Sequence, residues 1–249
     1  WTNLFSQEPS SNLPVPLCYN SIPNKLSQQD NNSITAPITL EELQSILHKL
    51  KPNSAPGPDE INYGILKALD ADNQQTLLAY LNSALSSKHL PQNWKTSKLW
   101  SIYKKNDKAD LNNYRPITLC QTMYKLFSQI INNRLYEAIE RNNIFSKAQA
   151  AFRKNHSTQL HIITLRNLIE EAHATKRPLH ALFIDLEKAY DSLPHKAIPL
   201  TLRYYGASKE VICLITKLYH NTHTIVCTRY GDTNPVSIKR GVKQGDPLS

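Results

Sequence analysis

ALFIDLEKAYDS, residues 181–192, is the strongest local feature of this sequence. It overlaps an apolar run, LHALFIDL (179–186), whose length and lack of alternation predict a buried β-strand. Asp185 stands near the end of that strand. An ionised carboxylate beside so apolar a strand costs free energy unless it is paired or bound to a metal. Two interpretations of Asp185 stay open: a ligand for a cation such as Mg²⁺, which prefers carboxylate oxygens, or a cap of the following turn.

The rest of the sequence predicts more helix than strand, which favours the α+β class. Thr39 opens the first helix in a capping box with Glu42, and the prolines of 51–59, KPNSAPGPD, exclude its continuation. Helices are expected at about 40–50, 60–69, 73–87, 121–141, 157–174, 195–204 and 208–219. Strands are expected at 97–104, 115–119 and 179–186, with a hairpin of 223–230 and 235–240 around Gly231-Asp232. Residues 1–36 have no period and are expected to form an irregular lead-in or linker.

Composition indicates the kind of partner. Lys and Arg number 29 against 20 Asp and Glu, a formal charge of +9, which favours a polyanion but is also compatible with a merely basic protein. The four cysteines lie far apart, which favours a reducing, intracellular location, nuclear or cytoplasmic. No apolar run approaches the ~20 residues that span a bilayer, so no membrane partner is expected. Trp1 at the start and GDPLS at the end suggest a fragment at both ends.

Four more segments carry recognisable motifs in a fixed order. They are APGPDEI (55–61), NYRPITL (113–119), QAAFRKNHST (149–158) and RGVKQGDPLS (240–249). With FIDLEKAYDS (183–192) they resemble the ordered motifs of reverse transcriptases, in the form that non-LTR retrotransposons show. The resemblance covers residues 55–249, roughly four fifths of the chain.

This resemblance implies the fingers and part of the palm of a right-hand polymerase fold. That fold is helix-rich, with a small antiparallel palm sheet that carries Asp185. The expected divisions are a lead-in at 1–36, an N-terminal extension with the fingers at 37–178, and a partial palm at 179–249.

The resemblance also implies roles for the residues near 185. Asp185 matches the catalytic carboxylate that binds Mg²⁺, with Mn²⁺ as an alternative, and the Leu186 carbonyl is an additional candidate ligand. Tyr190 matches the aromatic residue that excludes a 2′-hydroxyl from the incoming sugar, and ordinary core packing is its alternative. Glu187 and Asp191 are expected to support neighbouring groups or form salt bridges, not to bind the metal.

Other residues match positions that bind the nucleotide or the nucleic acid. Arg115, with Lys104 or Lys105, resembles the cations that hold the incoming triphosphate, although a solvated surface charge is equally compatible with Lys105. The remaining candidates are Gln244 and Gly245, which line the nucleotide pocket, and Arg153 and Lys154, which hold the template or primer backbone.

The sequence departs from the family pattern at one position, and it also offers a rival metal site. Ala151 replaces the family's usual glycine, and Asp246 is expected to cap a helix that begins at Pro247. Cys213, His220, His223 and Cys227 are of the types that zinc prefers, but their spacing fits no zinc module, so buried thiols and chance histidines are the better interpretation.

The activity implied is RNA-directed DNA polymerisation. Deoxynucleoside triphosphates would be added to the 3′-hydroxyl of a DNA primer on an RNA template by two-metal phosphoryl transfer. The family's next motif, an aromatic residue followed by any residue and Asp-Asp, does not occur in these 249 residues. The chain alone is therefore expected to be inactive. The alternative is a non-catalytic nucleic-acid-binding remnant of a retroelement.

Overall fold

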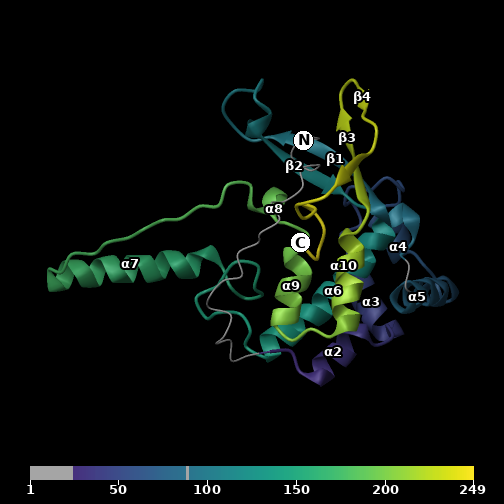
Figure 1. Cartoon of the computed structure of the whole chain (residues 1–249), viewed down its shortest axis with the longest axis horizontal. Coiled ribbons are helices and arrows are strands. Elements are labelled where there is room, and N and C mark those ends of the chain that lie inside the picture. The colour runs from purple at the N-terminus through teal and green to yellow at the C-terminus, as the bar shows by residue number, and fades with distance from the viewer. Residues whose placement is uncertain (1–24, 88–89) are drawn as a thin grey trace.

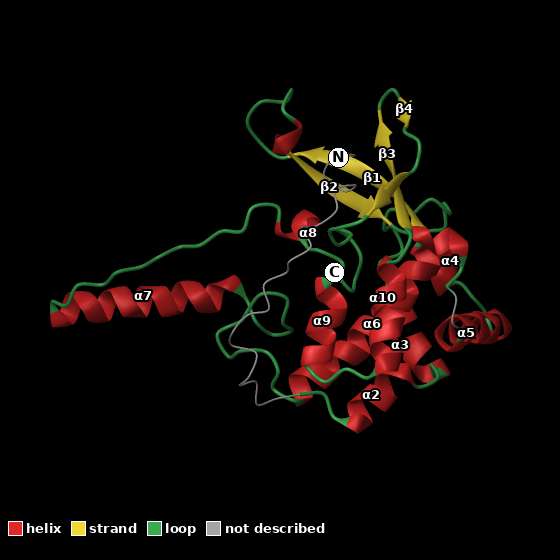
Figure 2. Ribbon diagram, viewed as in Figure 1, coloured by secondary structure: helices red, strands yellow, loops and turns green. Residues whose placement is uncertain are grey.

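The computed structural model describes residues 25–87 and 90–249, which form a helical body with a small sheet at one end (Figures 1 and 2). The helices are α2 (Gln28–Thr35), α3 (Leu40–Lys49), α4 (Tyr63–Lys67), α5 (Ala71–Ser86), α6 (Thr122–Arg141), α7 (Thr158–Thr175), α8 (Ala189–Ser192), α9 (Ala197–Tyr204) and α10 (Lys209–Tyr219). The strands are β1 (Thr96–Tyr103), β2 (Tyr114–Leu119), β3 (Thr222–Thr228), β4 (Gly231–Asp232) and β5 (Val236–Ile238). Within these described ranges, no helix combines the length and apolar character needed to cross a membrane.

The sheet has the order β2-β1-β3-β4, and β5 also pairs with β3. β1 and β2 are antiparallel, whereas β1 and β3 are parallel, with Lys98 opposite Ile225. The sheet is therefore mixed, where an antiparallel sheet was expected. It joins strands that come before and after residue 178, so segments far apart in the sequence lie side by side.

The core centres on α6, whose buried face includes Tyr124 and Phe127. Trp94, just before β1, packs its ring 6.3 Å from that of Tyr124 and 5.3 Å from that of Phe127. The predicted helix over 40–50 is confirmed as α3, and its apolar residues Leu43, Ile46 and Leu47, which recur at helical spacing, are buried. Fully burying one such side chain stabilises the fold by about 1.5–3 kcal/mol. Most predicted helices, β1, β2 and the hairpin of β3 with β5 are likewise present.

The amino-terminal helices show two differences from expectation. Residues 28–35 form helix α2, not an irregular lead-in, because Ser27 and Asp30 make a reciprocal capping box. Residues 1–24 of the expected lead-in lie outside the described residues. At α3, the Thr39 hydroxyl accepts from the Glu42 amide (3.2 Å) as predicted. The Glu42 carboxylate, however, binds Arg134 through two hydrogen bonds of 2.8 and 2.6 Å.

The predicted strand at 179–186 is wrong. These residues form an extended loop, and the exposed fractions of Leu182, Phe183 and Ile184 are 86%, 81% and 81%. Helix α7, which precedes this loop, has no buried residue and projects away from the helical body (Figure 1). A strand requires a hydrogen-bonded neighbour, and none of the described residues pairs with this segment.

Candidate active site

The site is built around residues 240–245, an irregular segment paired with the chain around α8. The Gly241 amide donates to the Leu193 carbonyl at 2.7 Å, and the Val242 amide donates to the Tyr190 carbonyl at 2.8 Å. At Gly241, where φ is +87°, a Cβ atom would lie 2.9 Å from the carbonyl oxygen of Asp191. Only glycine permits this close approach. The motif that begins at 240 is thus held directly against the turn that follows Asp185.

The same segment is also attached to β2. The Thr118 amide donates to the Gln244 carbonyl at 2.8 Å. Gly245 has φ +121°, and a Cβ atom there would lie 2.7 Å from the Thr118 carbonyl oxygen. Gln244 and Gly245, two predicted nucleotide-pocket residues, therefore occupy fixed backbone positions between β2 and α8.

Asp191 provides a side-chain link across this junction. It is only 4% exposed, and its Oδ1 accepts a hydrogen bond from Gln244 Nε2 at 3.3 Å. Burial raises the pKa of the Asp191 carboxyl, while the Gln244 hydrogen bond and the positive charge of Lys188 act in the lowering direction.

The residues nearest the expected metal site lie in different environments. Asp185 and Leu186 are exposed in the loop 177–188. Tyr190 is half-buried, with its ring 6.2 Å from that of Phe152 in an edge-to-face arrangement. The backbone pairing of Val242 with Tyr190 brings Tyr190 close to the segment that carries Gln244. Among the described residues, no group of three or more His, Cys, Asp or Glu side chains could hold a metal ion.

The predicted triphosphate-binding cations lie at one end of the sheet. Arg115 on β2 is opposite Ile102 on β1, and Lys104 follows β1 with its amide donating to the Asn113 carbonyl at 2.8 Å. Arg115, Lys104 and Lys105 are all exposed. Lys188 Nζ donates to Asn112 Oδ1 at 2.7 Å, which ties the turn after Asp185 to the loop before β2.

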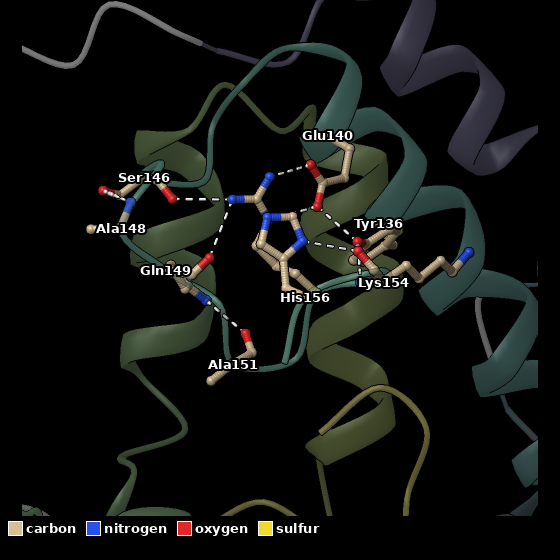
Figure 3. A network of polar contacts seen from close by, with 9 residues as sticks. Tyr136, Glu140, Ser146, Ala148, Gln149, Ala151, Lys154 and His156 are labelled. Carbon is tan, nitrogen blue, oxygen red and sulfur yellow. Dashed lines mark hydrogen bonds and ion pairs between the residues drawn. The ribbon is translucent and has the colours of Figure 1, made fainter. Parts of the chain in front are cut away.

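Arg153 lies in an intramolecular network that closes the loop between α6 and α7. Figure 3 shows its partners Glu140, Ser146 and Gln149. Its Nε and Nη2 atoms donate to the two oxygens of Glu140 at 2.9 and 2.7 Å. Its Nη1 donates to the carbonyls of Ser146 and Gln149 at 3.1 and 3.2 Å. Arg153 therefore fixes this loop, since its guanidinium donors are engaged within the chain.

Lys154 differs from Arg153 although the two are adjacent. Its amide donates to the Tyr136 hydroxyl at 2.7 Å, and its ammonium lies 4.8 Å from the centre of the Tyr136 ring. The residue is exposed. The Tyr136 hydroxyl in turn donates to Glu140 at 2.7 Å. Hydrogen bonds from Arg153 and Tyr136 lower the pKa of Glu140 to about 2.

A second buried cluster, not predicted from the sequence, supports residues 243–246. The Tyr124 hydroxyl donates to Asp246 Oδ2 at 2.8 Å, and the buried Lys243 ammonium lies 4.2 Å from the centre of the Tyr124 ring. No helix is assigned to 247–249, but Asp246 Oδ1 accepts from the Leu248 amide at 3.3 Å. Asp246 thus anchors the segment to α6 in addition to holding the following turn.

The segment 55–61 has a role that the sequence did not reveal. Asp59 Oδ2 accepts from the Thr122 amide at 2.6 Å, which caps the first turn of α6 from a distant part of the chain. Gly57 lies against the Cys120 carbonyl so closely that any Cβ atom would collide with it. The only signal available was the Pro-Gly-Pro-Asp run, which is typical of a fixed turn. This segment holds the junction between β2 and α6.

The four residues considered for zinc do not form a site in the described part of the chain. Cys227 is a buried thiol in β3, as expected, whereas Cys213 is exposed on α10, so the expectation of a buried thiol is wrong there.

Comparison with known proteins identifies the family. Residues 102–249 match the family model for "Reverse transcriptase (RNA-dependent DNA polymerase)". The "Transposon TX1 uncharacterized 149 kDa protein" of Xenopus laevis is 26% identical over 249 residues, all of this chain and 19% of the relative. The Pol polyprotein of the type-1 retrotransposable element R2 of Popillia japonica is 29% identical over 214 residues, 86% of this chain and 29% of the relative. The "RNA-directed DNA polymerase from mobile element jockey" of Drosophila melanogaster is 27% identical over 244 residues, 92% of this chain and 26% of the relative.

The chain thus spans less than a third of the length of each of these relatives. The resemblance to non-LTR retrotransposon enzymes drawn from the motifs is confirmed by these similarities. Since the family model covers more than half of its residues, this chain belongs to the reverse transcriptase (RNA-dependent DNA polymerase) family.

Proposed function

We propose that this chain supplies the nucleotide-binding part of an RNA-directed DNA polymerase of a mobile element, as fingers and partial palm. One observation carries the proposal: segments from three distant motifs meet at Gln244. Its backbone carbonyl accepts from Thr118, its side chain donates to Asp191, and Val242, two residues before it, pairs with Tyr190. Such convergence of sequence-distant polar residues is what a substrate pocket requires.

Each residue around this junction has a proposed role in positioning the nucleotide. Gln244 and Gly245 line its pocket, and Tyr190 excludes a 2′-hydroxyl. Arg115 and the exposed Lys104 and Lys105 bind the triphosphate at the end of the sheet, where guanidinium and ammonium groups suit phosphate oxygens.

Asp185 is the proposed metal-binding carboxylate, with the Leu186 carbonyl beside it. Mg²⁺, or Mn²⁺ in its place, would supply positive charge against the transferred phosphate when bound. The described residues do not complete such a site by themselves.

The proposed partners are an RNA template, a DNA primer and deoxynucleoside triphosphates. The formal charge of +9 supports binding to a polyanion. Within 149–158, Lys154 is the proposed phosphate contact because it is exposed, and Arg153 shapes the loop that presents it.

Primer extension tests this function. The chain is joined to a continuation that carries an aromatic-x-Asp-Asp motif and supplied with an RNA template, a DNA primer, deoxynucleotides and Mg²⁺. Asp185→Asn should lower the extension rate by about a hundredfold to a thousandfold, as loss of a charge-stabilising group at a reacting centre does. Glu187→Gln, an equally exposed carboxylate two residues away, is the matched control and should retain activity. Equal activity of Asp185→Asn and its parent would refute the proposed site.

A further inference from the structure

We propose that Asp191 is a positioning residue for Gln244: the buried Asp191 carboxylate sets which end of the Gln244 amide faces the nucleotide pocket. The inference rests on the proposed function, because it assigns Gln244 to that pocket. It concerns a residue for which the sequence suggested only a supporting or salt-bridging part.

The backbone on both sides of this contact is fixed. Gln244 is held to β2 through Thr118, and Val242 is held to Tyr190, the residue before Asp191. Gly241 lies against the Asp191 backbone at a distance that no other residue allows. Two residues that are 53 positions apart in the sequence therefore face one another in a constrained geometry, so their side-chain contact is not a chance surface encounter.

The chemistry of the two groups makes the contact directional. An ionised carboxylate only accepts hydrogen bonds, whereas an amide has a donor end and an acceptor end. The Gln244 nitrogen must therefore face Asp191 Oδ1, and the amide oxygen must face away from it. A neutral amide at position 191 would impose no such choice, because it can meet either end of Gln244.

The surroundings leave little room for a substitute partner. A cavity of about 10 Å³ lies beside the pair, lined by Asp191, Gln244, Thr118 and their neighbours. That is about the least volume that accommodates a single water. Asp191 is 4% exposed, so solvent cannot readily replace the Gln244 amide. The Asp191 carboxylate therefore depends on the Gln244 amide for this hydrogen bond.

Exchanging the acid and the amide between positions 191 and 244 tests this contact alone. The readout is the melting temperature of the chain itself. In Gln244→Glu, two carboxyl groups would oppose each other inside the protein, so the melting temperature should fall. Adding Asp191→Asn should restore it, since the new amide donates to the carboxylate introduced at position 244 and the hydrogen bond is remade in the opposite direction. This measurement does not depend on polymerase activity. If the double variant melts no higher than Gln244→Glu alone, the direct contact is refuted.

The positioning role is tested by kinetics in the chain with its catalytic continuation. Asp191→Asn should raise the KM for deoxynucleotides about tenfold with a smaller change in kcat, which corresponds to one lost orienting hydrogen bond to a charged group. In a Gln244→Ala background, the same substitution should change KM less than about twofold, because nothing remains to be oriented. Glu187→Gln serves as the charge-matched control.

The outcomes separate this inference from the function on which it rests. If Asp191→Asn raises KM equally with and without Gln244, Asp191 does not act through Gln244 and the inference is wrong, while the polymerase assignment stands. If the parent chain with its continuation does not extend a primer, the proposed function fails, whatever the melting data show.

Discussion

The Thr118 amide donates to the Gln244 carbonyl oxygen at 2.8 Å, so strand β2 is joined directly to the final motif of the chain. Gly245, the next residue, has φ +121° and lies against the Thr118 carbonyl. The arrangement explains why a glycine follows Gln244. For the same reason, one methyl group added at Gly245 would disturb the junction between β2 and Gln244.

Gly245→Ala should therefore destabilise the chain and disturb the nucleotide pocket. The unfavourable backbone conformation costs about 1–3 kcal/mol, and the added Cβ atom also collides with Thr118. Gly231→Ala is the matched control, because Gly231 has a similar φ of +125° but nothing within 4 Å of its added Cβ. Chemical denaturation should show a larger loss for Gly245→Ala. Equal losses would mean that β2 and Gln244 are not in contact.

Tyr190→Ala should admit ribonucleotides in the chain joined to its catalytic continuation. Removing the ring opens space for a 2′-hydroxyl, so the ratio of deoxyribonucleotide to ribonucleotide incorporation should fall at least about tenfold, the factor that about 1.4 kcal/mol of discrimination represents. Phe152→Ala is the control, since it removes the ring that contacts Tyr190 and leaves Tyr190 in place. An unchanged ratio in Tyr190→Ala would assign the ring to packing alone.

Lys154→Ala and Arg153→Ala should have different effects although the residues are adjacent. Removing a phosphate contact lowers the slope of log affinity against log salt by about 0.7 on single strands. Lys154→Ala should show this change in fluorescence anisotropy with RNA. Arg153→Ala should instead lower the melting temperature, because it removes two hydrogen bonds to Glu140 and one to each of the Ser146 and Gln149 carbonyls. If Arg153→Ala lowers the salt slope and Lys154→Ala lowers the melting temperature, Arg153 is the phosphate contact and Lys154 supports the loop.

Acid should weaken the loop between α6 and α7 through Glu140. Its pKa in the folded chain is about 2, below the ordinary value of a glutamate. A depressed carboxyl pKa contributes stability that is present above the unfolded pKa and is lost as pH falls through the folded one. Stability should thus decline from about pH 4.3 toward about 2, and Glu140→Gln should show a shallower decline over that window. Identical pH profiles would exclude Glu140 as the source.

Local patterns were enough to predict most elements of this fold. Thr39 caps α3, and the apolar stripe of that helix is buried as its spacing indicates. The hairpin of β3 with β5 follows from two short runs with a turn between them, although Gly231 and Asp232 pair with β3 as strand β4. These features depend on residues that are close together in the sequence, so they can be predicted from one sequence.

Features that depend on distant partners were missed. The run at 179–186 has the composition of a strand, but a strand forms only against another strand, and composition does not show whether one is present. The parallel pairing of β1 with β3 joins residues more than a hundred positions apart. At the candidate site, the motifs indicated Gln244 and Tyr190, and a supporting part was expected for Asp191. The partner of Asp191, and the buried supports Tyr124 and Lys243, were visible only once the chain was folded.

Primer extension by the 249-residue chain, beside the same chain joined to an aromatic-x-Asp-Asp continuation, tests whether Asp185 needs a second set of carboxylates for catalysis. Two-metal catalysis requires carboxylates from two places to hold ions ~3.5–4 Å apart, and these residues supply Asp185 but no Asp-Asp pair. On an RNA template with Mg²⁺, we expect no extension by the chain alone. The continued chain should extend the primer, and Asp185→Asn should abolish that extension. Extension by the 249 residues alone, or undiminished extension by the continued Asp185→Asn variant, would contradict it.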